Sequence, residues 1–383
     1  MLAAALAACG PPPAPTPPAV KPSPVVKAPP PAVTAAPVSL PDFSLVARPA
    51  VAPVCAAPPA GEPGPIPGGF LEVTLPAQTP ALVDVEGRDD RDVWFLPEWG
   101  HEPGLLHWDG ATLSEDRISC HPGEGVGLSL GRSEVIAVTT YDNGEYMEFR
   151  EARRSPKGTW SCTDQDTQEL YLGVGEEMLR VSAVGWPDLG GHALPIADVG
   201  KTWSLLSAPH LAGRAADDVW VRLNRNDVLH WNGVVWEDRS PALSSVEDLH
   251  VSTNGAVWIA GNYDNAANGS ENGHGEAEEG SKGGRVVLRW DPAAQTWVCF
   301  PTPVDFHARH VRGGSGEEVW LLGEKEIYHW DGKAFQRAVT PTPHLTDAWL
   351  APTGELWLVG WKDTEDPGGK VGLAFRTRRG GNP

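Results

Sequence analysis

Polar side chains that could bind a ligand recur in this sequence at fixed distances before a repeated tryptophan position. In several copies of the repeat, such a residue stands ten or eight residues before that position. Carboxylates and imidazoles held at close range can bind a divalent cation or a polar ligand. The candidate ligand-binding residues are Asp84, Glu86, His210, Asp248, His250, His310, Arg312, Asp347 and Trp349.

Known catalytic motifs are missing from the sequence. It has no nucleophile elbow, no His-Glu-x-x-His helix, no phosphate-binding loop and no EF-hand pattern. We therefore expect a non-catalytic protein with no cofactor, apart from a divalent cation such as calcium at the candidate residues. A hydrolase or lyase that uses the same polar residues is the alternative function.

A repeated pattern must position these residues. An Asp-x-Trp or Glu-x-Trp segment is followed by a loop and then by a signature such as His107-Trp108-Asp109-Gly110. Alternating apolar and aromatic residues that end in Asp-Gly predict strand-turn-strand units. The anchor positions, including two degenerate copies, are Trp94, Ile136, Ser182, Trp220, Trp258, Trp320 and Trp357.

The spacing of these anchors predicts an all-β, seven-bladed propeller. Periods of roughly 40 residues with four strands per unit indicate propeller blades. The last copy ends at its third strand, residues 373–377, whereas a strand-like segment at residues 70–75 has no copy of its own. We expect this N-terminal strand to complete the last blade, which closes the ring and removes its free edges.

Innermost strands line the channel of a propeller, so the candidate residues should surround one side of the channel mouth. A solvated channel lining without a ligand is the alternative for them. Most of the 17 Trp residues occupy repeated positions and should pack between blades. The repeated His107, His230 and His329 are expected to be structural for the same reason. Trp99, Trp186, Trp349 and Trp361 lie off the repeated positions.

Cysteine use predicts disulfides. Four cysteines follow Cys9, and an even number in an oxidising compartment suggests two disulfides with three possible connectivities. Cys120 and Cys162 follow the outer strands of adjacent predicted blades and are our first choice as a pair. Free buried thiols are the alternative.

The repeats resemble those of Trp-rich propellers in bacterial secreted proteins and lipoproteins. The segment from Ile196 to Trp203 also resembles a degenerate Asp-box, the hairpin motif of sialidase-type propellers. The resemblance implies architecture more than activity, because one fold hosts many functions. It implies that the alternative enzyme would be of a sialidase-like or polysaccharide-processing type.

The N-terminus predicts a tethered protein. Leu6-Ala7-Ala8-Cys9 resembles a lipobox, so residues 1–9 are interpreted as a truncated lipoprotein signal with Cys9 lipidated. Residues 10–68 form a proline-rich segment that we expect to be a disordered stalk. Residues 69–383 make up the propeller. We expect the protein in the cell envelope, at the outer membrane, or otherwise secreted.

Charge limits the partners. A net charge of -20 disfavours nucleic acid, and membrane contact is expected only through the lipid anchor. The long, acidic loops between second and third strands share one face. We expect a monomer that binds a protein or glycan ligand on this long-loop face, as a surface-tethered scaffold.

Overall fold

Strands make up all the regular structure in the part of the chain that the computed structural model describes. The chain divides into two compact units, Met1–Ser44 and Leu45–Pro383, and the described residues belong to the second. No helix in the described part is long and apolar enough to span a membrane. The described residues are 55, 63–98, 104–118, 124–142, 147–165, 169–174, 177–182, 188–189, 192–193, 210–222, 226–234, 236–263, 284–303, 306–314, 318–365 and 369–377.

The strands form six blades, each built from antiparallel strands that follow chain order from the inside outward, except that β2 is the outermost strand of blade 6 and β1 is added in parallel to blade 5. Blade 1 consists of β3 (Leu82–Asp89), β4 (Asp92–Pro97), β5 (Gly104–Trp108) and β6 (Leu113–Arg117). Blade 2 consists of β7 (Glu124–Leu130), β8 (Val135–Asp142), β9 (Met147–Arg154) and β10 (Trp160–Gln165). Blade 3 consists of β15 (His210–Ala215), β16 (Asp218–Arg222), β17 (Val228–Trp231) and β18 (Trp236–Asp238).

The remaining three blades follow the same plan. Blade 4 consists of β19 (Ser245–Val251), β20 (Val257–Tyr263), β21 (Gly284–Asp291) and β22 (Thr296–Phe300). Blade 5 consists of β23 (His310–Gly313), β24 (Val319–Leu322), β25 (Glu326–Trp330) and β26 (Phe335–Val339), with β1 (Gly64–Pro65) added outside. Blade 6 consists of β27 (His344–Leu350), β28 (Leu356–Asp363), β29 (Lys370–Thr377) and β2 (Phe70–Glu72).

The prediction of seven blades is wrong. Where the third copy was expected, the described residues form only two two-stranded sheets, β11 (Glu169–Val174) with β12 (Glu177–Ser182) and β13 (Asp188–Leu189) with β14 (His192–Ala193). The anchor of that copy is Ser182, whose hydroxyl side chain has far less apolar surface to bury than Trp. The degenerate Asp-box lies outside the described residues.

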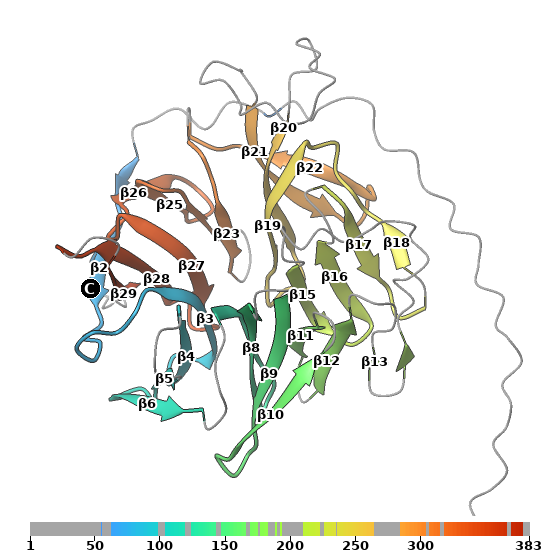
Figure 1. Ribbon diagram of the computed structural model, residues 1–383. Helices are drawn as coiled ribbons and strands as arrows, with labels where there is room; N and C mark the ends of the chain where they lie inside the picture. The colour runs from blue at the N-terminus through green and yellow to red at the C-terminus, as the bar shows by residue number, and fades with distance from the viewer. Residues whose placement is uncertain are drawn as a thin grey trace, which may run out of the picture. The chain divides into compact units, whose positions relative to one another are not determined.

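Innermost strands of successive blades lie side by side around a common centre (Figure 1). β15, β19, β23, β27, β3 and β7 follow one another in this order, and β11 contacts both β7 and β15. The predicted closure is confirmed, because Leu71 of β2 pairs with Arg376 of β29. The backbone N–H of Val73 extends this pairing by donating to the Ala374 carbonyl over 2.9 Å.

Anchor tryptophans fill the space between blades, as predicted. Trp258 of β20 is 1% exposed and packs with Val319 and Leu321 of the next blade. Trp357 of β28 packs in the same way against Val85 of blade 1. Burial of such large rings supplies much of the apolar area that stabilises a propeller.

The repeated histidines are structural, again as predicted. His107 stacks on the anchor Trp94 with ring centroids 4.1 Å apart, and its Nε2 lies 2.9 Å from the Asp92 carboxylate. Trp94 donates its indole N–H to the same carboxylate over 2.7 Å. His230 and His329 make equivalent stacks on the anchors of their blades. The repeated Asp or Glu therefore fixes the His and, in blade 1, the Trp as well.

Candidate functional site

The candidate residues lie on five consecutive innermost strands. They are Asp84 and Glu86 on β3, His210 on β15, Asp248 and His250 on β19, His310 and Arg312 on β23, and Asp347 and Trp349 on β27. The structure therefore gathers residues that are far apart in sequence along one arc of the ring. Sequence periodicity was sufficient to find this arc, but not the contacts within it.

Arg312 is the centre of the arc. Its guanidinium is bound by two carboxylates, with Nη1 2.5 Å from Asp248 Oδ2 and Nη2 2.8 Å from Asp347 Oδ1. Nε donates to the Ala348 carbonyl over 2.5 Å. Burial disfavours the charged form of Arg312, but Asp248 and Asp347 hold its pKa above the usual range. Burial also disfavours the charged form of Asp248 and would raise its pKa, yet Arg312 and nearby histidines keep this pKa below its usual range.

Three aspartates of the arc also link neighbouring blades through backbone N–H groups. Asp248 Oδ2 accepts from Val311 N over 2.8 Å, and Asp347 Oδ2 accepts from Val85 N over 3.1 Å. Asp84 Oδ2 accepts from Leu128 N over 2.6 Å. In each case the donor belongs to the innermost strand of the next blade. We did not predict this structural role, although the recurrence of Asp ten residues before an anchor was a signal for it.

Two carboxyl groups of β3, those of Asp84 and Glu86, have raised pKa values. Burial, followed by repulsion from Asp347, raises the pKa of Glu86 to about 8. Burial and the neighbouring Asp347, to which its carboxyl is hydrogen-bonded, also raise the pKa of Asp84 well above its usual range. A protonated carboxyl group can donate a hydrogen bond, which an ionised one cannot.

The histidines of the arc are neutral near pH 7. Burial lowers the pKa of His210 and of His250 to about 4, and it lowers the pKa of His310 as well. His250 Nε2 lies 3.1 Å from the Gly313 carbonyl of the next blade, so its ring also joins two strands. His210 and His310 both interact electrostatically with Asp248.

No set of three His, Cys, Asp or Glu side chains within the described part of the chain is placed to hold a metal ion. Asp248 and Asp347, which we considered as ligands for calcium, instead bind the guanidinium of Arg312. A divalent cation would have to displace Arg312 from them.

The off-position tryptophans that the structure describes are engaged in packing. The ring of Trp349 covers Gly87 so closely that a methyl group there would lie 2.5 Å from it. Trp361 stacks on His344 with ring centroids 3.7 Å apart, and the Lys370 ammonium lies 4.8 Å from its centroid. Trp99 and Trp186 lie outside the described residues.

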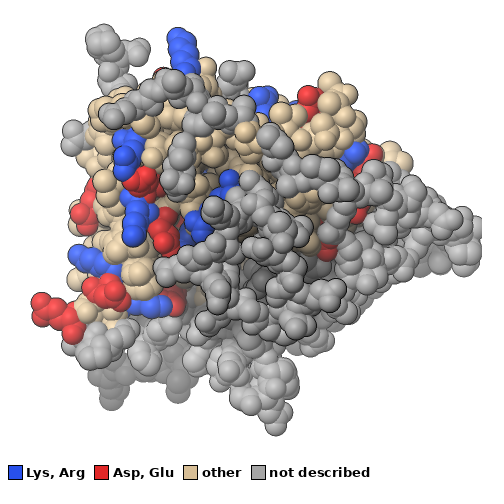
Figure 2. Space-filling view, turned by 90° about the horizontal axis from the view of Figure 1, so that it is seen from above, with Lys and Arg blue, Asp and Glu red and all other residues tan. Residues whose placement is uncertain are grey.

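The acidic long-loop face is described only at its edges. Glu98 forms an ion pair with Lys370 over 2.9 Å, whereas Asp363 and Glu365 are exposed. In the view from above, Lys and Arg side chains lie beside Asp and Glu side chains over the described surface (Figure 2). Most of the acidic loop residues lie outside the described part, so the charge of the whole face stays a prediction.

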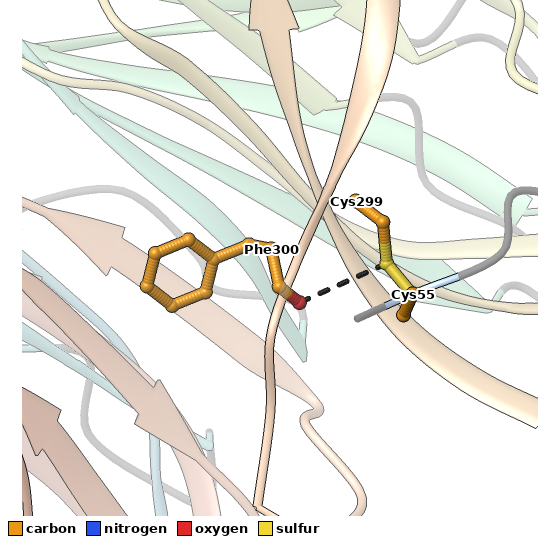
Figure 3. The surroundings of a disulfide bond; sticks show 3 residues. All are labelled: Cys55, Cys299 and Phe300. Carbon is orange, nitrogen blue, oxygen red and sulfur yellow. Dashed lines mark hydrogen bonds between the residues drawn. A yellow bond between two sulfur atoms is a disulfide. The ribbon is translucent and has the colours of Figure 1, made fainter. Parts of the chain in front are cut away.

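Disulfides are present, as predicted. Cys55 is bonded to Cys299 on β22, with Cα atoms 5.1 Å apart (Figure 3). Cys162 is also disulfide-bonded, and its partner lies outside the described residues. The pairing of Cys162 with Cys120 therefore stays a prediction. Cys9, the proposed lipidation site, lies outside the described residues too.

Solved structures similar to this chain are β-propellers with diverse roles. YCF48 bound to a D1 peptide matches 84% of this chain and 100% of its own, with a TM-score of 0.58 and 14% identity. Virginiamycin B lyase from Staphylococcus aureus matches 80% of this chain and 98% of its own, with a TM-score of 0.54 and 13% identity. The WD40 propeller domain of Doa1 matches 81% and 98%, with a TM-score of 0.54 and 10% identity.

No protein-family model matches the chain. No curated protein matches it either. Since the sequence identities to these solved structures are low, the similarities show that the chain is a propeller built from repeats. They do not show its function, which has to be argued from the candidate site.

Proposed function

We propose that this protein is a non-catalytic binding or scaffold propeller of the bacterial cell envelope, lipidated at Cys9 and carried on a stalk formed by the part of the proline-rich segment 10–68 that precedes Cys55. Its ligand would be a protein, with a glycan as the other class. A protein ligand is favoured because a similar propeller, YCF48, has been solved bound to a peptide.

The observation that carries this proposal is the use of the polar arc as internal support. The carboxylates of Asp84, Asp248 and Asp347 each bind a backbone N–H of the next blade. Two of them are also neutralised by Arg312. Groups fixed in this way are poorly placed to change protonation during a reaction, whereas a rigid ring suits the presentation of a binding surface.

Glu86, His210 and His310 take no part in these inter-blade bonds, and we propose them as the ligand contacts of the arc. Cross-linking of the full-length protein in envelope membranes, with cross-linked peptides mapped by mass spectrometry, tests this. We expect a partner cross-linked near β23 and loss of that cross-link in Glu86→Gln/His310→Gln.

Asp331→Asn is the matched control. Asp331 closes a hairpin turn by accepting from Lys333 N and Ala334 N, and Asn232 fills the equivalent place in another blade. The control should keep the cross-link. If the partner is still cross-linked in the double variant, Glu86 and His310 are not ligand contacts.

Lipid anchoring has its own test. Cys9→Ser, expressed with an upstream signal, should release the protein into the soluble fraction, because a lipid chain is the only membrane attachment proposed. Unchanged membrane retention would contradict the anchor.

A channel-mouth hydrolase or lyase is the second candidate, and the raised pKa of Glu86, about 8, favours it. A carboxyl protonated near neutral pH can serve as a general acid. If this candidate is right, Glu86→Gln should abolish turnover of a polysaccharide or ester substrate panel. A wild-type protein inactive on that panel from pH 5 to 9 supports the binding function instead.

A further inference from the structure

The N-terminal part of the described chain runs along the outer rim of three successive blades. Cys55 is bonded to β22 of blade 4, β1 pairs with β26 of blade 5, and β2 pairs with β29 of blade 6. We call Cys55 together with Pro63–Val73 the N-terminal strap. It therefore meets the outer strands of blades 4 and 5 in turn and, as β2, is itself the outermost strand of blade 6.

In the described upstream half of the strap, Cys55 packs against the core of blade 4, and Gly64, Pro65 and Ile66 contact blade 5. β1 pairs in parallel with β26 at Gly64 and Pro65 only, and proline has no N–H to donate. Ile66 adds one hydrogen bond, from its N–H to the Arg337 carbonyl over 3.2 Å. Its side chain, 7% exposed, joins the core cluster that contains Trp320.

The downstream half closes the ring. β2 has three paired positions with β29, and Val73, 8% exposed, continues the pairing and joins the core between blades 6 and 1. If these few pairs separated, β29 would become a free strand edge.

We propose that the Cys55–Cys299 disulfide acts as a clasp: it carries tension that reaches the chain from its N-terminal side, and so protects the β2–β29 pairing that closes the ring. This inference rests on the proposed tether. A pull that arrives at Cys55 passes through the disulfide into β22, which is paired with β21 along its length. Without the bond, the same pull reaches β1 and then β2, because these strands follow Cys55 in the chain.

The clasp is also sensitive to reduction. A dithiol reductant would break the sulfur–sulfur bond, supply two electrons and two protons to form the thiols of Cys55 and Cys299, and become a disulfide itself. Cell-envelope compartments are oxidising, which would keep the clasp closed.

Amide hydrogen exchange tests whether the clasp holds the upstream strap. In full-length Cys55→Ser/Cys299→Ser, we expect the Ile66 amide to exchange about tenfold faster or more, because the covalent bond no longer restrains local opening of the strap around it. The Val73 amide should keep its wild-type rate. Reduced wild-type protein should behave like the variant, and Cys162→Ser, which removes a disulfide bond elsewhere, should change neither amide.

Single-molecule pulling tests the load path. Handles would be placed at the N-terminus and on a click-reactive lysine analogue at Lys157, an exposed turn residue of blade 2. The double Ser variant should show an early, low-force step that frees the strap up to Val73, and the oxidised wild-type protein should lack it. The same early step in both proteins would overturn the proposal, as would equal acceleration of Ile66 and Val73 in the exchange experiment.

These outcomes are distinct from failure of the tether. If Cys9→Ser stays membrane-bound, the lipid anchor is wrong. The pulling and exchange results then still decide whether the disulfide shields the closing strand.

Discussion

A single guanidinium, that of Arg312, joins three neighbouring innermost strands. It lies on β23, binds Asp248 of β19 and Asp347 of β27, and donates to the Ala348 carbonyl. Both Arg312 and Asp248 are less than a tenth exposed. The buried carboxylate of Asp248 and the partly buried carboxylate of Asp347 therefore share one cation.

Replacing Arg312 by Met should be strongly destabilising. Removing one partner of a buried ion pair leaves uncompensated charge and costs about 3–5 kcal/mol. Urea unfolding of Arg312→Met should show this loss, and Arg312→Met/Asp248→Asn/Asp347→Asn should recover part of it. Arg337→Met, which removes a surface pair with Glu326, should cost less than about 1 kcal/mol. Equal losses in Arg312→Met and Arg337→Met would contradict the central role of Arg312.

Sequence spacing placed Arg312 and the carboxylates on innermost strands, because position along a repeat predicts position along a strand. It could not show that the three side chains meet. That depends on the distance and twist between separate blades, which no spacing within a single blade encodes. Two of the carboxylates that we considered for a divalent cation are paired with Arg312, and the cation itself stays a prediction.

Contacts between neighbouring blades depend on glycines that face a tryptophan ring. Gly313 on β23 lies against Trp258 of β20, and a methyl group at Gly313 would be 2.4 Å from the indole nitrogen. Gly87 on β3 lies against Trp349 in the same manner. Each glycine lets an aromatic ring from one blade approach the innermost strand of the next.

Gly313→Ala should weaken the junction of blades 4 and 5. Forcing an extra methyl group into a filled interior costs about 1–3 kcal/mol, and the fully buried Trp258 has little room to move away. Calorimetry should show a lower Tm. Gly64→Ala is the control, since no atom lies within 4 Å of a methyl group there. A Tm equal to that of wild type for Gly313→Ala would show that the ring can shift.

The sequence identified strands well where the anchor is a large apolar residue and failed where it is not. Trp94, Trp220 and Ile136 are all buried, and each belongs to a complete blade. The copy with Ser182 at this position was given a blade because of its spacing and because residues 182–186 resemble residues 357–361. Spacing says where a strand could begin, but burial of apolar area decides whether a sheet is stabilised there.

At the scale of the whole molecule, groups of the arc with opposite pKa shifts set the pH dependence of stability. Glu86 has a native pKa of about 8 against 4.5 when unperturbed, so the native state keeps a proton that the unfolded state loses. Its contribution is fully present below about pH 4.5 and is lost as the pH rises from 4.5 through 8. His210 and His250, with native pKa values of about 4 against 6.5, contribute stability that is lost as the pH falls from 6.5 through 4.

Stability should therefore be greatest near pH 6.5 and fall toward pH 8.5, with a limiting slope of about 1.4 kcal/mol per pH unit for each proton released. Urea midpoints at pH 6.5, 7.5 and 8.5 measure this. Glu86→Gln should flatten the fall, leaving the share of Asp84, while Glu98→Gln at the surface should not. An unchanged slope in Glu86→Gln would show that Glu86 is ionised in the folded protein.

The same closure that completes blade 6 also sets the order of events during folding. Of the described strands β2 is the second and β29 the last in chain order, and they are separated by roughly 300 residues, so their pairing is a contact of very high order. Until β29 has been synthesised, the other blades can form while the ring stays open. We expect ring closure to be the slow and final step. Before it occurs, the unpaired edges of β2 and of its partner blade are most exposed to aggregation or to binding by a chaperone.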